Sequence, residues 1–268
     1  MKNKNLILIV IILLLASCTP KPQQLLILCT NDSHSQIEAK NGSGGFAARA
    51  DLVDSLRQIY PLNLLLDAGD MVQGTPYFNV YHGRIEMAGY NRLGYDAVTL
   101  GNHEFDFGLD TLAMFLNLAA FPIVSCNYDV KGTPLENIVK PYAVFERGGM
   151  KIAVIGFGVS PKSLILPTNF EPIQYLDPIE RGNFYADSLR KSGCDFVIAL
   201  SHLGYYSDSI PVGDSILAVQ SKNIDLILGG HTHDVRKDTT IMNVENRPVH
   251  YLTTKKAGLE MDKVIVNF

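Results

Sequence analysis

Aspartate, asparagine and histidine residues of this sequence gather in five short segments, and each segment directly follows an apolar run. The segments are Asn31–His34, Asp67–Asp70, Gly101–Asp106, Ser201–Gly204 and Gly229–His233. They contain five of the seven histidines. Carboxylate and imidazole groups bind metal ions and transfer protons, so the pattern predicts one site built from all five segments.

The spacing within the segments is typical of metal ligands. Asp32 with His34, and His231 with His233, each place two side chains on one face of an extended or turning backbone. Such ligands suit the divalent ions of Zn, Mn, Fe or Co. Seven candidates are too many for one tetrahedral ion and fit two ions about 3.5–4 Å apart that share a carboxylate. The candidates are Asp32, His34, Asp70, Asn102, His202, His231 and His233. Asp70 is the expected bridge, because a carboxylate can give one oxygen to each ion.

Two residues of the third segment are candidates for catalysis. His103 is not needed as a ligand, and we expect it to face the leaving group of a substrate. Asp106 is expected to orient this imidazole and to stabilise its protonated form. Two ions lower the pKa of a water and neutralise charge on a phosphoryl oxygen, so the set predicts phosphoryl chemistry. Asp67 is interpreted as structural and Glu104 as a solvated neighbour.

Each segment needs a strand that ends just before it. Short apolar runs predict these strands at 25–30, 63–66, 96–100, 195–200 and 224–228. Further strands are predicted at 122–125, 142–145, 151–157, 249–253 and 263–268, and helices at 46–60, 84–93, 109–119, 178–192 and 213–221. Buried strands that alternate with amphipathic helices predict an α/β layered fold in one domain. The carboxyl ends of its strands would bring the five segments into one crevice.

Composition excludes several protein classes. The chain has 268 residues, of which 47% are hydrophobic and 19% charged, and its formal net charge is −4. These values predict a folded domain and exclude wholesale disorder. The acidic excess argues against a nucleic-acid polymer as partner, because that would need a basic surface. Cys29, Cys126 and Cys194 lie in or beside apolar runs and are expected to be buried, unpaired thiols.

The first residues predict export. Lys2 and Lys4 precede an apolar run of eleven residues that ends in Leu15-Ala16-Ser17-Cys18. This run is too short for a bilayer, which needs about 20 residues, and is typical of a signal peptide, here residues 1–17. The ending resembles a bacterial lipobox, which implies a lipid on Cys18, a tether over 18–24, and periplasm-facing attachment to the cell envelope. A cleaved signal with an incidental cysteine is the alternative.

The order DSH, GD, GNHE, SH and GGHTH resembles the calcineurin-like metallophosphoesterase superfamily. More narrowly, TNDSHSQIE, LLLDAGDMVQGTPYF, GYDAVTLGNHEFDFG and DLILGGHTHD resemble the catalytic, N-terminal domain of the bacterial 5′-nucleotidase / UDP-sugar hydrolase family. The resemblance covers residues 25–268. It implies a four-layer α/β/β/α sandwich with a dinuclear metal site at the carboxyl ends of its strands.

The resemblance also implies a role for each candidate. Asp32, His34, Asp70 and His233 would hold the first ion, and Asp70, Asn102, His202 and His231 the second. His103 and Asp106 match the family's catalytic dyad, and Asn102 with His103 would reach the substrate phosphate. The implied reaction converts 5′-nucleotides to a nucleoside and phosphate.

Several alternatives stay open. Family members of this kind continue into a second domain that holds the base, and we expect that domain to be absent here. The expected partners are a nucleotide or other phosphate ester, the membrane through Cys18 and, as one alternative, a separate polypeptide that supplies the missing half. Other possible substrates are 2′,3′-cyclic nucleotides and UDP-sugars. A different class is a lipid-anchored binding or assembly subunit with a structural metal site, against which His103 and Asp106 argue.

Overall fold

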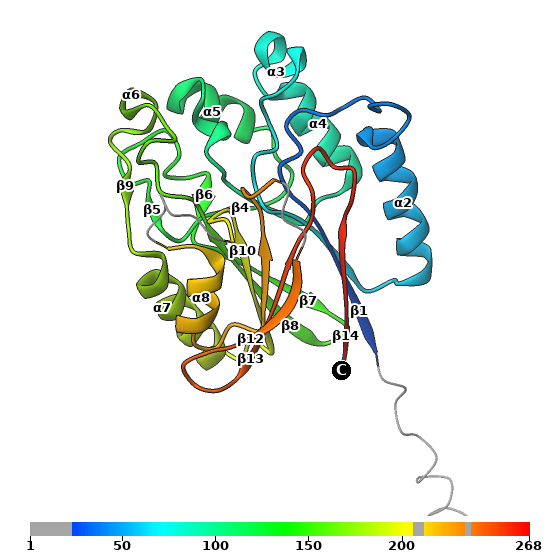
Figure 1. Ribbon diagram of the computed structural model, residues 1–268, viewed down its shortest axis with the longest axis vertical. Coiled ribbons are helices and arrows are strands. Elements are labelled where there is room, and N and C mark those ends of the chain that lie inside the picture. The colour runs from blue at the N-terminus through cyan, green and yellow to red at the C-terminus, as the bar shows by residue number, and fades with distance from the viewer. Residues whose placement is uncertain (1–22, 206–211, 234–236) are drawn as a thin grey trace, which may run out of the picture.

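Two six-stranded sheets lie face to face, and helices cover their outer faces (Figure 1). The structure, a computed structural model, describes residues 23–205, 212–233 and 237–268. The layers follow one another as α/β/β/α, so the predicted fold class is confirmed. The signal segment and Cys18 lie outside the described residues.

The first sheet has the strand order β14-β1-β2-β3-β4-β6. Its strands are β14 (Asp262–Asn267), β1 (Gln24–Thr30), β2 (Asn63–Asp67), β3 (Ala97–Thr99), β4 (Ile123–Val124) and β6 (Val139–Lys140). Only the pairing of β14 with β1 is antiparallel within this described sheet. The carboxyl ends of β1, β2 and β3 therefore meet at one edge.

The second sheet has the order β12-β13-β11-β10-β8-β7. Its strands are β12 (Lys237–Met242), β13 (Pro248–Thr253), β11 (Leu226–Gly229), β10 (Phe196–Ser201), β8 (Met150–Phe157) and β7 (Tyr142–Arg147). The four central strands are parallel, and β12 and β7 are antiparallel edge strands. A small separate sheet pairs β5 (Tyr128–Asp129) with β9 (Gln174–Tyr175).

Helices pack on the outer faces of the two sheets. The first sheet is covered by α2 (Gly45–Ile59), α4 (Arg84–Leu93) and α5 (Gly108–Leu116), and the second by α7 (Pro178–Lys191) and α8 (Asp214–Gln220). Three shorter helical segments are α3 (Pro76–Tyr81), α6 (Pro167–Phe170) and a 3-10 turn, η1 (His103–Phe105). Within the described residues, no helix combines the length and the apolar character needed to cross a bilayer.

Alternate residues of the central strands face different cores. Along β10, Val197 and Ala199 pack under the helices of the second sheet, whereas Ile198 and Leu200 pack against the first sheet. A strand that is buried on both faces needs apolar residues at every position, which explains the continuous apolar runs of the sequence. Cys29, Cys126 and Cys194 are buried and free, as predicted.

Some elements were not predicted from the sequence. The edge strand β12 alternates partly buried and exposed residues, and its sequence KDTTIM lacks an apolar run. The strands β5, β6 and β9 have two residues each. Such short or edge elements depend on pairing with a neighbour rather than on their own apolar pattern.

The layer between the sheets should dominate stability. Ile198 is fully buried there, whereas Ile59 at the end of α2 is 67% exposed. We expect Ile198→Ala to lower the free energy of unfolding by about 2–5 kcal/mol, because it leaves a cavity in a packed core. Ile59→Ala, the matched control, should cost no more than about 0.5 kcal/mol. Urea unfolding of both variants checks this, and equal losses would contradict the assignment of the core.

Candidate metal centre

The polar segments converge because their strands end at the same edge. Three segments follow β1, β2 and β3 of the first sheet, and two follow β10 and β11 of the second. Direct contacts join the two sheets there. The backbone N–H of His231 donates to Asp32 Oδ2 (2.9 Å), and His202 Nε2 lies 3.2 Å from Asp70 Oδ2. All seven candidate ligands are at this edge.

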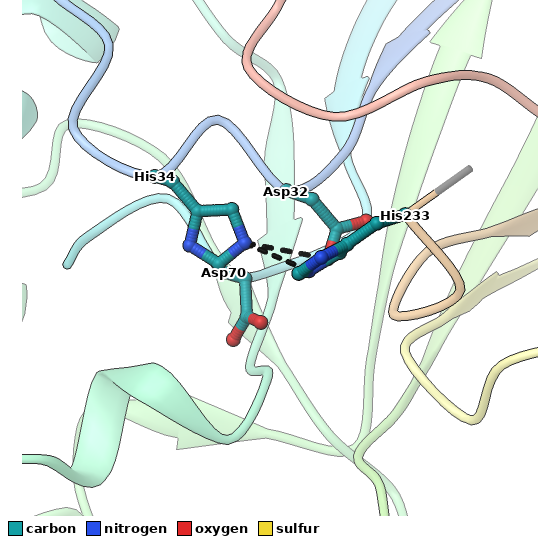
Figure 2. Close-up of side chains that lie close together, drawn as sticks. All are labelled: Asp32, His34, Asp70 and His233. Carbon is teal, nitrogen blue, oxygen red and sulfur yellow. Dashed lines mark hydrogen bonds and ion pairs between the residues drawn. The ribbon is translucent and has the colours of Figure 1, made fainter. Parts of the chain in front are cut away.

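Four of these side chains lie close together, those of Asp32, His34, Asp70 and His233 (Figure 2). Each offers one ligand atom, and these atoms all lie within 4.8 Å of one another. The Nε2 atoms of His34 and His233 are 2.9 Å apart, and His233 Nε2 lies 3.3 Å from Asp32 Oδ1. This group combines two imidazoles with two carboxylates, a donor set suited to a divalent ion.

A second group contains Asp70, His202 and His231, whose ligand atoms also lie within 4.8 Å of one another. Asp70 belongs to both groups, which is the geometry expected of a bridging carboxylate. Asn102 is only 6% exposed, and its Oδ1 has no hydrogen-bond partner in the part of the chain that the structure describes. The two groups thus form one cluster suited to a dinuclear metal site.

The hydrogen bonds of His202 show that the cluster fits a cation. Its Nδ1 donates to the backbone oxygen of Ala68 (2.6 Å), so this nitrogen carries the ring proton. In its neutral form the ring would present an unprotonated Nε2 to the carboxylate of Asp70, and among the described residues no other group hydrogen-bonds to His202 Nε2 or Asp70 Oδ2. Two facing lone pairs in a fully buried position require a positive charge between them.

The pKa values of His202 and His231 also indicate that the cluster needs a positive charge. Burial alone would lower the pKa of His202, but the carboxylates of Asp70 and Asp32 raise it to about 10. Burial and the charge of His202 lower the pKa of His231 to about 4. Without a cation, a proton on His202 thus balances the carboxylates. A divalent ion would displace this proton, because a nitrogen ligand must be deprotonated.

A left-handed backbone conformation orients several of these side chains. Asp32, His34, Asp70 and His231 all have φ between 46° and 71°. This left-handed conformation costs about 1–2 kcal/mol for a residue with a Cβ, and such strain gathers at functional sites. Gly101 permits the close approach of a third loop, since a Cβ there would lie 2.2 Å from Asp70 Oδ1.

Glu104 is not the solvated neighbour that the sequence suggested. Its side chain is 1% exposed and accepts hydrogen bonds from the backbone N–H groups of Gly101 (2.6 Å), Asp70 (3.1 Å) and Met71 (2.8 Å). Burial and the charge of Asp70 raise its pKa to about 8. The prediction was wrong because the three N–H groups that need an acceptor come from two loops far apart in sequence. Glu104 fixes the loop that carries Asp70.

We expect Glu104→Gln to weaken metal binding by about 10- to 100-fold, the usual effect of losing a group that orients a ligand. The amide would turn a donor toward backbone N–H groups that need an acceptor. Competition with a chromogenic chelator measures the change. Glu146→Gln on β7, where the side chain is exposed, is the control. Unchanged metal affinity in Glu104→Gln would contradict the role of Glu104.

A second hydrogen-bond network supports the loops that follow β1 and β2. Arg49 of α2, which is 3% exposed, donates from Nη2 to Ser33 Oγ (3.0 Å) and from Nη1 to Tyr95 OH (3.1 Å). Asp67 accepts from the backbone N–H of Gly69 (2.9 Å) and from Tyr90 OH (2.8 Å), so it is structural, as predicted. Sequence reasoning missed Arg49, because nothing in the pattern of α2 distinguishes it from a surface arginine.

His103 and Asp106 lie beside the cluster and form a pair. His103 Nδ1 is 2.9 Å from Asp106 Oδ2, and the His103 ring lies 5.3 Å from that of His34, centroid to centroid. Both side chains are about one-third exposed. Burial lowers the pKa of His103, but the hydrogen bond with Asp106 and the nearby carboxylates outweigh it and raise that pKa above its ordinary value. The pair therefore presents a proton donor at the accessible rim of the cluster.

Comparison with known proteins identifies the family. The model of the calcineurin-like phosphoesterases matches residues 25–235, which is most of the chain. The chain belongs to the calcineurin-like phosphoesterase family. Together with the relatives below, this match indicates a metal-dependent hydrolase.

Sequence relatives within this family include 5′-nucleotidases. Snake venom 5′-nucleotidase of Gloydius brevicauda is 36% identical over 224 residues, which are 78% of this chain and 37% of that protein. Protein UshA of Yersinia enterocolitica is 36% identical over 227 residues, which are 80% of this chain and 41% of that protein. The chain therefore spans about two fifths of the length of these curated relatives.

Solved structures of the family share the fold. The 5′-nucleotidase precursor from Thermus thermophilus superposes with a TM-score of 0.83 and 32% identity, over 91% of this chain and 51% of that chain. The NAD nucleotidase of Haemophilus influenzae superposes with a TM-score of 0.82 and 29% identity, over 92% of this chain and 54% of that chain. The resemblance found in the sequence to the N-terminal domain of 5′-nucleotidases is thereby confirmed.

Proposed function

We propose that this phosphoesterase hydrolyses phosphate monoesters of nucleotides with the help of two divalent cations. The observation that carries the proposal is the position of Asp70, which belongs to both groups of ligand atoms. Asp32, His34, Asp70 and His233 would hold one ion. Asp70, Asn102, His202 and His231 would hold the other. The donor types suit Zn, Mn, Fe or Co.

The two ions, when bound, supply a water of lowered pKa and neutralise charge that develops on the phosphoryl group. The residues of the chain then position and protonate the substrate. Asn102 and His103 face the phosphate from the loop after β3. His103, held by Asp106 in its protonated form, stabilises the transition state and gives its proton to the departing alkoxide.

The proposed substrate class is a 5′-nucleotide, and the products are a nucleoside and inorganic phosphate. The 5′-nucleotidases among the relatives support this choice. UDP-sugars and 2′,3′-cyclic nucleotides are the alternatives, because the same ligand set would serve either ester. An assembly subunit with a structural metal site would not need the His103–Asp106 pair at the rim.

Steady-state hydrolysis by residues 19–268 tests the proposal. AMP, UDP-glucose, 2′,3′-cyclic AMP and bis(p-nitrophenyl) phosphate are offered with Mn or Zn added. Fast AMP turnover at micromolar KM would show that this domain recognises nucleotides by itself. Activity on AMP only at millimolar substrate would assign nucleotide recognition to residues outside this sequence, such as a separate polypeptide. No activity with any metal would overturn the proposal in favour of a binding subunit.

We also propose that the protein is attached to the bacterial cell envelope by a lipid on Cys18 and faces the periplasm. The sequence Leu15-Ala16-Ser17-Cys18 after a basic and apolar leader supports this. Incorporation of a labelled fatty acid into the wild type, with Cys18→Ala as the control, tests it. Label in neither protein would contradict lipid attachment.

A further inference from the structure

The loop that joins β13 to β14 is fastened to the candidate metal centre. The backbone N–H of Ala257 donates to Asp32 O (2.7 Å), and that of Lys256 donates to His233 O (3.2 Å). Asn31 Nδ2 also donates to the backbone oxygen of Thr254 (3.2 Å). In Figure 1 this red loop lies beside the blue loop that follows β1. The side chains of the loop are therefore held at the rim of the cluster.

Two consecutive lysines of this loop have different partners. Lys255 Nζ lies 3.9 Å from Glu260 Oε1, within the loop itself. Lys256 Nζ lies 3.1 Å from His233 Nδ1, on the ring of a proposed ligand. Lys255 therefore pairs with a carboxylate of the same loop, whereas Lys256 contacts a proposed metal ligand.

The contact between Lys256 and His233 fixes the protons of the ring. An ammonium group only donates, so His233 Nδ1 is the acceptor and the ring proton lies on Nε2. This proton then lies toward His34 Nε2, 2.9 Å away, and Asp32 Oδ1, 3.3 Å away. It thus occupies the space between groups that would share a cation.

Cation binding would break this arrangement. If His233 Nε2 binds an ion, the ring proton must move to Nδ1, as in other metal-bound histidines. Nδ1 and the ammonium group of Lys256 would then both be donors and could not bond to each other. The exposed ammonium group of Lys256 would then be released from His233, and its flexible side chain could carry it to another acceptor at the rim of the same centre.

We propose that Lys256 binds the phosphoryl group of the substrate, or free inorganic phosphate, once the metal ions are bound. The inference rests on the proposed function, because the phosphoryl group is the acceptor that this reaction brings to the rim. A phosphate oxygen can accept a charge-assisted hydrogen bond from an ammonium group. Lys256 is a phosphate-binding residue that exchanges its histidine partner for the anion.

Isothermal titration of the metal-loaded protein with inorganic phosphate tests the proposal. Lys256→Gln should raise the Kd for phosphate about 10- to 100-fold, the usual loss for a hydrogen bond from a charged group. Lys256→Arg should recover part of the affinity, because it keeps the charge. Lys255→Gln is the matched control and should change Kd less than about twofold, because the Lys255 ammonium group faces Glu260 rather than a proposed metal ligand. Metal content, measured by mass spectrometry, should stay the same in all three variants.

Three outcomes would overturn the inference. Unchanged phosphate affinity in Lys256→Gln would exclude the contact. Equal losses in Lys255→Gln and Lys256→Gln would show a general effect of charge. Loss of metal from Lys256→Gln would show that Lys256 only positions His233. Failure of the proposed function is distinguishable, because wild-type protein that hydrolyses no ester but binds phosphate through Lys256 would refute the function and leave this inference standing.

Discussion

Replacing His103 by alanine should lower kcat by about 10²- to 10⁴-fold and leave both metal ions bound. His103 lies next to the cluster but belongs to neither group of ligand atoms among the described residues. Its imidazole pairs with Asp106 and stays partly exposed, as a group that meets a leaving oxygen must. The variant therefore removes the proton donor without removing a ligand.

The measurement is kcat on bis(p-nitrophenyl) phosphate and on AMP, with the metal content of each preparation determined in parallel. His250→Ala is the matched control, because His250 on β13 also pairs with an aspartate, Asp238 on β12, at 2.7 Å, but belongs to neither group of ligand atoms among the described residues. The control should retain full activity. A His103→Ala variant with unchanged kcat, or one that loses metal, would refute the assignment.

The pH profile gives an independent test of the same pair. The pKa of His103 is raised, and the reaction needs the protonated ring, so kcat should fall as pH rises through that raised pKa. Asp106→Asn removes the carboxylate that stabilises the imidazolium, so this fall should move to lower pH. The profile is measured between about pH 5 and 10. If the fall of kcat at high pH does not move in Asp106→Asn, a group other than His103 controls that fall.

Replacing Asp70 should remove both metal ions, because this carboxylate belongs to both groups. In Asp70→Asn an NH2 group that cannot bind a cation replaces one carboxylate oxygen. The remaining carbonyl oxygen carries no formal charge. We expect less than about one-thousandth of wild-type activity, since both functions of the ions are lost together.

Metal stoichiometry separates Asp70 from ligands of a single ion. After dialysis against micromolar Mn or Zn, the wild type should retain two ions, His231→Ala one ion and Asp70→Asn none. Asp187→Asn on α7, where the side chain is 49% exposed, should retain both. One ion retained by Asp70→Asn would show that Asp70 is not shared, and the two-ion site would need another bridge.

The fold could be predicted because its central strands are buried on both faces. Their continuous apolar runs, the helices between them and the polar segments that follow them left few other arrangements. The edge strand β12 was missed, since its pairing with β13 comes from the neighbour and not from its own pattern. The boundaries of the elements that were predicted differ from the observed ones by only a few residues, where the ends depend on local hydrogen bonds.

The candidate ligands were found from residue type and spacing alone, because metal chemistry restricts both. Sequence could not show which side chains support them. Arg49 contacts Ser33 across 16 positions, Glu104 contacts Asp70 across 34 positions, and Lys256 contacts His233 across 23 positions. The chemical types of the ligands and their order on the strands were thus determined by the sequence. The tertiary structure alone decided that Asp70 lies in both groups and that Lys256 faces the rim, because those positions depend on how two sheets pack and how the loops between them are tied.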